Sequence, residues 1–322
     1  MKSFLLKPSG KDYIWGGTRL KSQFHKELPL SPLAETWECS VHPDGPSFAA
    51  SGELRGWPLP DVLAAHPEYL GTSPSVQGGG LHLLVKLIDA KENLSVQVHP
   101  DDAYAYANEG GQEGKTEMWY VVDAEPGARL VFGLNRMMTP ESLRSSLKRG
   151  TVESCLRYVP VRKNDVFFIP AGTIHAIGQG ALVAEIQQSS NLTYRLYDYG
   201  RLGKDGRPRE LHVDKALDVA DLSGAQNPRQ PMRVLRYKRG FAEESLCKCP
   251  FFEVDRCLLN GEGVVLSPLP ESYRVLLCLE GAGCFYEGDT PLHFHKGDTI
   301  FIPATADELE ISGGAEFLLI RG

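Results

Sequence analysis

The segment NDVFFIPAGTIHAI, residues 164–177, has a near copy later in the same chain. The copy is GDTIFIPATADELEI, residues 297–311, and the two align without a gap on the pattern Asp-x-x-Phe-Ile-Pro-Ala. A similar strand precedes each of them, EMWYVVDAEPG from residue 117 and RVLLCLEGAG from residue 274. Recurrence of a motif together with its upstream strand indicates that one structural unit occurs twice. The sequence therefore predicts the same β-barrel in each half of the chain.

The segments around these motifs favour a mostly β chain with a few short helices. Short runs rich in Val, Ile, Phe and Tyr are separated by Gly, Pro, Asp or Asn, and the 322 residues include 33 Gly and 22 Pro. Capped amphipathic patterns predict helices in DDAYAYANE, TPESLRSSLKRG and HVDKALDVADL. A polar stretch with two prolines, residues 221–232, is interpreted as a linker between a first domain over 1–220 and a second over 233–322.

The two copies differ where polar side chains could act. The place of His175 in the first copy is taken by Glu308 in the second, and the place of Glu117 is taken by Arg274. Polar residues that only stabilised the barrel would have less reason to differ so completely between the two copies. We therefore expect the first barrel to carry the functional site and the second to be a degenerate, supporting barrel.

Composition excludes several classes of function. The net charge of −7 disfavours nucleic acid as a partner, because phosphate backbones are bound by clustered Lys and Arg. The longest apolar runs fall far short of the ~20 residues that span a bilayer, and the first residues lack a secretory cleavage site. Seven Cys without paired spacing fit the reducing cytoplasm better than a disulfide framework. The sequence predicts a cytoplasmic protein without a membrane partner.

A possible metal site begins in LSVQVHPDD, residues 94–102. Alternation along a strand places Gln97 and His99 on one face and the intervening valines on the other. A single strand histidine is usually structural. Together with Glu117 and His175, however, these residues offer imidazole nitrogen, carboxylate oxygen and an amide oxygen, which suit a borderline divalent metal such as zinc with one position open for substrate.

Further motifs carry a resemblance to a known family. They occur in order between Tyr13 and Arg201 and are YIWGGTRL, AETWECSVHPDGPS, LSVQVHPDD, GKTEMWYV, IPAGTIHAIGQG and EIQQSSNLTYRLYDYGR. Together they resemble the type I mannose-6-phosphate isomerases in their short bacterial form, which belong to the cupin superfamily. The resemblance implies two cupin-type, jelly-roll-like barrels, a bound Zn²⁺ and interconversion of mannose 6-phosphate and fructose 6-phosphate through a cis-enediol.

The resemblance also assigns roles to individual residues. It places zinc on Gln97, His99, Glu117 and His175, catalysis on Arg195 and Glu185, and the substrate on Lys86, Ser95, Lys115 and Glu35. The residue types alone leave alternatives open. The guanidinium of Arg195 suits an enediolate or a phosphate equally well, and either lysine could be a solvated edge-strand residue. Arg201 could form a salt bridge or contact the substrate.

Two functions from other classes compete with the isomerase. A cupin that only binds a sugar phosphate would act as a sensor, and loss of Glu185 or Arg195 would have favoured it. A cupin oxygenase would need iron with an open facial site, and Gln97, Lys115 and the strand TYRLYDYGR argue against that reading. The expected partner is a small sugar phosphate, and the sequence does not indicate how many subunits assemble.

Overall fold

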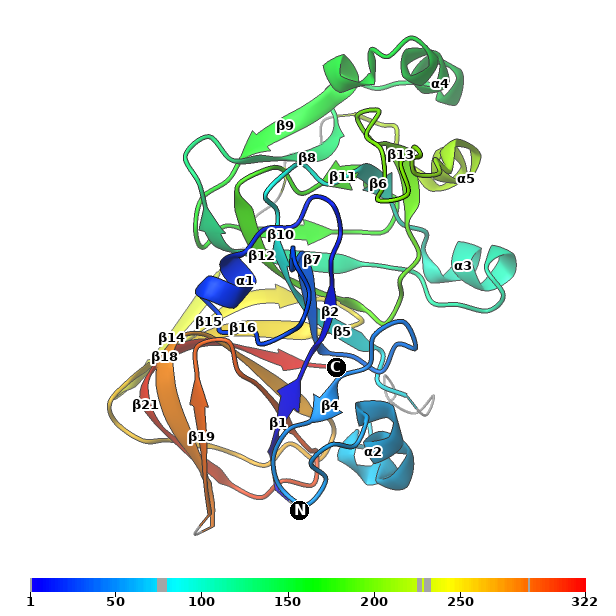
Figure 1. Ribbon diagram of the computed structural model, residues 1–322. Helices are drawn as coiled ribbons and strands as arrows, with labels where there is room; N and C mark the ends of the chain where they lie inside the picture. The colour runs from blue at the N-terminus through cyan, green and yellow to red at the C-terminus, as the bar shows by residue number, and fades with distance from the viewer. Residues whose placement is uncertain (1, 74–79, 225–227, 229–232, 289) are drawn as a thin grey trace.

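The protein is described here by a computed structural model that covers residues 2–73, 80–224, 228, 233–288 and 290–322. Strands dominate, and the helices are short and lie at the periphery (Figure 1). The helices are α1 (Arg19–Ser22), α2 (Leu59–Ala65), α3 (Asp102–Asn108), α4 (Pro140–Lys148) and α5 (Val213–Val219), with 3₁₀ turns η1 (Pro67–Tyr69) and η2 (Val152–Cys155). The expected helices in DDAYAYANE, TPESLRSSLKRG and HVDKALDVADL are thus present. No described helix has the length and apolar character needed to cross a membrane.

Two of the expected helices, α3 and α4, each begin at a residue whose side chain caps the helix. The carboxylate of Asp101 accepts a hydrogen bond from the backbone N–H of Tyr104, at 2.8 Å, at the start of α3. The hydroxyl of Thr139 accepts from the backbone N–H of Ser142, at 3.2 Å, at the start of α4. Such caps satisfy N–H groups that have no partner within the helix.

A central sheet of six strands carries most of the polar site. Its strands are all antiparallel to their neighbours and are, in order across the sheet, β10 (Val166–Ile169), β7 (Glu117–Ala124), β12 (Ala181–Gln188), β5 (Leu83–Asp89), β3 (Glu35–Cys39) and β2 (Ser9–Lys11). Every residue of β5 and β12 is buried. Burial on both faces explains why these strands read as nearly continuous apolar runs rather than as alternating patterns.

A second sheet of five strands packs on one face of the central sheet. In order across the sheet its strands are β13 (Tyr194–Tyr197), β6 (Val96–Val98), β11 (His175–Ala176), β8 (Arg129–Leu134) and β9 (Leu156–Pro160). Trp119 and Val183 of the central sheet join Leu130 and Phe132 of the second sheet in one apolar cluster. The outer face of the second sheet packs against α4 and α5 (Figure 1).

The C-terminal half forms a ten-stranded sheet that also includes the start of the chain. Its main path is β14 (Val234–Lys238), β15 (Phe241–Lys248), β16 (Glu253–Asn260), β21 (Leu309–Arg321), β18 (Arg274–Glu287), β20 (Thr299–Ile302), β1 (Phe4–Lys7) and β4 (Phe48–Ala49). β17 (Val264–Leu266) pairs with β21, and β19 (Thr290–His295) pairs with β18. The first strand therefore lies beside β20, nearly the whole chain away in sequence (Figure 1).

The two halves share a buried interface. Val85 and Leu87 of the central sheet pack in one apolar cluster with Val275, Leu277 and other residues of the C-terminal sheet. A polar contact crosses the same interface, where the buried Lys26 ammonium lies 2.7 Å from Glu38 Oε2 and the Thr299 hydroxyl donates to the same oxygen at 2.9 Å. The central sheet is thus covered on both faces, and its strands are fixed in place.

The strand register agrees with the internal repeat. Ile169 pairs with Glu117 in the first half, and Ile302 pairs with Arg274 in the second, so that Glu117 and Arg274 occupy equivalent places before the repeated Pro-Ala turn. Arg274 is buried, and Glu308 is exposed. The division into domains 1–220 and 233–322 stays a prediction, and residues 225–227 and 229–232 of the expected linker lie outside the described residues.

Candidate active site

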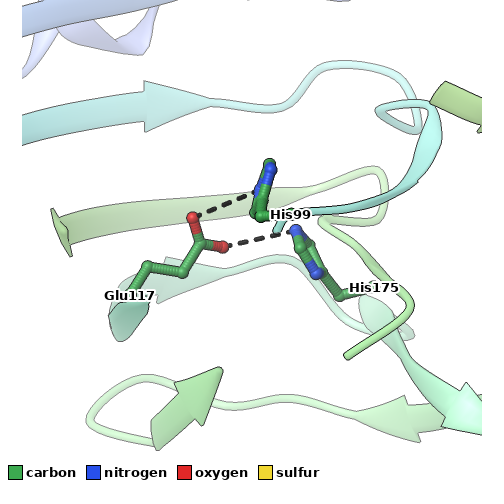
Figure 2. Close-up of side chains that lie close together, drawn as sticks. All are labelled: His99, Glu117 and His175. Atoms are coloured by element: carbon green, nitrogen blue, oxygen red, sulfur yellow. Dashed lines mark ion pairs between the residues drawn. The ribbon is translucent and has the colours of Figure 1, made fainter. Parts of the chain in front are cut away.

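Three candidate ligands meet between the central and second sheets. His99 follows β6, Glu117 begins β7 and His175 begins β11, and all three side chains are buried. Glu117 Oε1 lies 3.3 Å from His175 Nε2, and Glu117 Oε2 lies 3.6 Å from His99 Nε2 (Figure 2). Their ligand atoms lie within 4.8 Å of one another. Within the described part of the chain, this is the His, Cys, Asp and Glu cluster whose geometry could hold a metal ion.

Both imidazoles are oriented by the backbone. His99 Nδ1 lies 2.7 Å from the carbonyl oxygen of Leu192, and His175 Nδ1 lies 2.8 Å from that of Thr173. A proton on each Nδ1 leaves the Nε2 lone pair directed at the Glu117 carboxylate, an arrangement that is typical of metal-binding histidines. Burial lowers the pKa of His175 to about 4 and that of His99 well below its usual range, so both rings are in the neutral form that binds metals.

The fourth expected ligand reaches the same point. Gln97 on β6 pairs with His175 on β11, and its amide Nε2 lies 3.3 Å from His175 Nε2. Val96 and Val98 point into the apolar cluster on the opposite face of the sheet, as strand alternation predicts. Both oxygens of the Glu117 carboxylate are buried; Oε1 has no hydrogen-bonding partner among the described residues, and Oε2 lies 2.9 Å from the Lys115 ammonium. Two imidazoles, an amide and a carboxylate with free lone pairs fit a divalent cation.

Backbone contacts bring the ligand motifs HPDD and GKTEM together. The backbone N–H of Lys115 donates to the carbonyl of Pro100 at 3.0 Å. A Cβ on Gly114 would lie 2.5 Å from the carbonyl carbon of Asp101, closer than any side chain tolerates. Glycine is therefore required where these two segments cross, and the crossing places His99 beside the start of β7.

A row of polar and aromatic residues crosses the central sheet next to the ligands. The register pairs Trp37 with Lys86, Lys86 with Glu185, and Glu185 with Trp119 across β3, β5, β12 and β7. Lys86 Nζ donates to Glu185 Oε1 at 3.1 Å, and Trp119 Nε1 donates to Glu185 Oε2 at 2.8 Å. On β3, Trp37 Nε1 donates to Glu35 Oε2 at 2.8 Å. Each tryptophan thus fixes one carboxylate of the site.

Lys115 connects this row to the ligands. Its Nζ lies 2.9 Å from Glu117 Oε2, 3.9 Å from Glu185 Oε1 and 3.1 Å from His99 Nε2. Burial raises the pKa of Glu185, but Lys115 and Lys86 outweigh burial and hold it well below its usual range. Burial and nearby Glu185 raise the pKa of Glu117, against the effect of Lys115. The positive charge of a bound metal ion would favour the ionised form of Glu117 at neutral pH.

The row and the ligands border a cavity of about 270 Å³. Its lining contains the predicted residues Glu35, Lys86, Ser95, Gln97, Lys115, Glu185 and Arg195. His99, Glu117 and His175 lie next to this lining, through their contacts with Gln97 and Lys115. The structure thus brings together all ten residues to which the resemblance assigns a role. Arg195 on β13 pairs with Gln97 on β6, one strand from the candidate metal ligands.

Sequence reasoning missed several residues of this cavity. Thr193 and Asn191 precede β13, and Arg209 lies on the loop that follows it. Arg201, the residue that closes the YDYGR motif, is absent from the lining and binds Asp198 and the carbonyl of Asn93 instead. No local pattern marked Arg209, because it belongs to a polar loop without a periodic signal. The Trp119 and Glu185 contact could have been anticipated only from the strand register.

Comparison with known proteins identifies the family. Residues 3–123 match the description "Phosphomannose isomerase type I, catalytic domain", and residues 242–321 match "Mannose-6-phosphate isomerase, cupin domain". The chain is 36% identical to the mannose-6-phosphate isomerase of Streptococcus mutans, with 95% of this chain and 93% of that protein aligned. The chain belongs to the type I phosphomannose isomerase family.

Other family members agree in sequence and in fold. Mannose-6-phosphate isomerase ManA of Bacillus subtilis is 35% identical, with 97% of this chain and 96% of that protein aligned. The crystal structure of a mannose 6-phosphate isomerase from Bacillus subtilis superposes with a TM-score of 0.93 at 34% identity and covers 99% of both chains. The expected mostly β, cupin-type fold is therefore confirmed.

Proposed function

We propose that this chain interconverts mannose 6-phosphate and fructose 6-phosphate and that its metal is Zn²⁺, bound by Gln97, His99, Glu117 and His175. The observation that carries the proposal is the placement of a buried carboxylate, Glu185, in the small cavity that this donor set borders. The reaction moves a proton between C1 and C2 and develops negative charge on an enediolate. A zinc ion would supply positive charge that stabilises the developing enediolate.

Glu185 is the proposed base. Its low pKa keeps it ionised at neutral pH, and the hydrogen bonds from Lys86 and Trp119 hold both of its oxygens in place. A fixed carboxylate can take the C2 proton of the aldose and return it to C1 on the same face of a cis-enediol. Burial excludes water, which strengthens the electrostatic effect of the neighbouring cations on the intermediate.

The other cavity residues bind and orient the substrate in this proposal. Lys86 and Lys115 place two ammonium groups beside Glu185, while Ser95 and Glu35 offer a hydroxyl and a carboxylate to the sugar hydroxyls. Arg195 brings a permanent positive charge to the same cavity and is proposed as a catalytic residue. Proximity of these groups to one ligand set supports a single site for binding and chemistry.

The proposed substrate is a small soluble sugar phosphate, and the proposed compartment is the cytoplasm. The seven cysteines are all free thiols, which agrees with a reducing environment. The residues are Cys39, Cys155, Cys247, Cys249, Cys257, Cys278 and Cys284.

A coupled assay for fructose 6-phosphate formed from mannose 6-phosphate tests the proposal. Turnover should be lost on chelation and restored when zinc is added back, with metal content measured on the same samples. Glu185→Gln is expected to keep the metal and lose roughly 10²–10⁴ in kcat, the usual range for a general base. A folded, zinc-loaded protein without turnover would contradict the substrate assignment and favour a sugar-phosphate sensor. Full activity after complete metal removal would contradict the metal assignment.

A further inference from the structure

Three arginines gather around Asp198 beside the cavity. Arg195 and Arg209 line the cavity, and Arg201 lies beside them outside the lining. Arg209 donates from Nε and Nη2 to the two oxygens of Asp198, at 2.8 and 2.6 Å, and Arg201 donates to the same carboxylate at 2.6 Å. Asp198 is 5% exposed, so this shared carboxylate is fixed inside the protein.

The two lining guanidiniums are held close to each other. Arg195 Nη1 donates at 2.7 Å to the carbonyl oxygen of Glu210, the residue that follows Arg209 in the chain. Arg195 Nε is buried and has no hydrogen-bonding partner among the described residues. Arg209 uses Nε and Nη2 for Asp198, which leaves Nη1 for another acceptor. Both side chains therefore retain donors after their protein contacts have been made.

The positive charges of these three arginines are not fully balanced by nearby carboxylates. Arg201 and Arg209 share the buried carboxylate of Asp198, and Arg195 forms no ion pair with a described residue. Glu92, 3.9 Å from Arg201, and Glu210, next to Arg209 in the chain, are 57% and 84% exposed. Burial lowers the pKa of Arg195, and the positive charges of Arg209 and Arg201 lower it further, against the effect of Asp198. A local excess of half-buried positive charge indicates a site for an anion.

The balance of charge is different around the two lysines of the cavity. Lys86 and Lys115 lie against the carboxylates of Glu185, Glu117 and, farther along the row, Glu35. Two ammonium groups and three carboxylates leave no positive excess there apart from that of a bound divalent metal, which the developing enediolate requires. A phosphate dianion is therefore accommodated better by the arginines than by the lysines.

From this arrangement we infer that Arg209, beside Arg195, binds the phosphate group of the substrate and that Asp198 is a positioning residue that orients the Arg209 guanidinium. This inference rests on the proposed function, because it names the part of the same cavity that recognises the phosphate. With the phosphate bound by Arg209, C1 and C2 of the sugar would face Glu185 and the metal ligands. Arg201 acts on this site only through Asp198, and its remaining hydrogen bond goes to the carbonyl oxygen of Asn93.

Arg209→Gln in the zinc-loaded enzyme tests the inference, with Arg207→Gln as the matched control. Arg207 is exposed on the same loop, does not line the cavity and carries the same charge. Loss of a charge-assisted contact should raise the KM for mannose 6-phosphate and the inhibition constant of inorganic phosphate by roughly tenfold to a hundredfold. The value of kcat should stay within about threefold, because binding to a remote phosphate is similar in ground and transition states. Arg207→Gln should change none of these quantities.

Two further variants keep the test informative if Arg209→Gln disturbs the loop. Arg209→Lys preserves the charge but lacks the planar fork, so phosphate inhibition should weaken by an intermediate factor. Asp198→Asn should raise KM with little change in kcat. Phosphate inhibition that is the same in all variants as in Arg207→Gln would overturn the inference, and so would a fall in kcat without a change in phosphate inhibition.

Direct titration of inorganic phosphate by calorimetry separates the two proposals, because it requires no turnover. Phosphate binding that is weakened by Arg209→Gln in a protein without isomerase activity would support the anion site and contradict the proposed function. Isomerase activity with phosphate binding that Arg209→Gln leaves unchanged would contradict the anion site alone.

Discussion

Replacement of Trp119 by Phe should slow the reaction by displacing Glu185. The indole Nε1 of Trp119 donates at 2.8 Å to Glu185 Oε2, and both residues are buried. A hydrogen bond to a charged group contributes about 1.5–3 kcal/mol. Because Lys86 still holds the other oxygen at 3.1 Å, we take the lower end, about 1.5 kcal/mol, which corresponds to roughly a tenfold loss of kcat.

The same substitution should change the pH profile in a defined direction. The hydrogen bond from Trp119 lowers the pKa of Glu185, so its removal raises that pKa. A carboxylate acts as a base only when it is ionised, so activity is lost as the pH falls through the pKa of Glu185. The variant, with its higher pKa, should therefore lose activity at a higher pH than the native enzyme. Because the pKa in the native protein lies far below neutral, Glu185 stays ionised at pH 7, and the loss of kcat there reflects orientation rather than protonation.

Steady-state kinetics of the zinc-loaded Trp119→Phe enzyme between acidic and neutral pH, with metal content measured at each pH, checks this prediction. Trp37→Phe is the matched control, because Trp37 is equally buried and donates to Glu35 at the same distance. It should raise KM rather than lower kcat, since Glu35 is proposed to bind substrate. An unchanged kcat and acidic limb in Trp119→Phe would refute the reasoning, as would equal effects of both variants on kcat.

Three other predictions follow from the structure. His175→Ala and Glu117→Gln should each lose bound metal together with activity, which elemental analysis and the coupled assay would detect; retention of stoichiometric metal by both would contradict the ligand set. Arg195→Ala should keep its metal and lose turnover, and normal rates would contradict its assignment. Glu38→Gln should lower the free energy of unfolding by roughly 3–5 kcal/mol, because it leaves the buried Lys26 ammonium without its carboxylate. If denaturant unfolding shows a decrease of less than about 1 kcal/mol, this ion pair does not stabilise the fold as expected.

Short-range patterns made much of the candidate site predictable. Strand alternation placed Gln97 and His99 on one face, and the repeated Asp-x-x-Phe-Ile-Pro-Ala motif placed His175 after a turn that the second copy shares. The register of Glu117 with Ile169 and of Arg274 with Ile302 supports the alignment of the two copies. These features can be predicted from sequence because the side-chain period of a strand and the residue types of a turn are local properties.

Other features depend on contacts that no local pattern encodes. β1 pairs with β20 although nearly the whole chain separates them, so the start of the sequence gave no sign that it completes the C-terminal sheet. The run ALVAEIQQ predicted a strand but not that Glu185 lies between Lys86 and Trp119, because the pairing partners of a central strand are chosen by the fold.

The sequence by itself determined the fold class and the internal repeat, because these follow from periodicity and from residue types in fixed local order, and its resemblance to a known family singled out the metal-binding and catalytic candidates. Only the tertiary structure decided which cations remain available to a phosphate. Lys86 and Lys115 are compensated by buried carboxylates, whereas Arg209 shares Asp198 with Arg201, and Arg195 donates to a backbone carbonyl. Charge compensation depends on distances between side chains from separate strands and loops, and those distances exist only once the sheets have packed together.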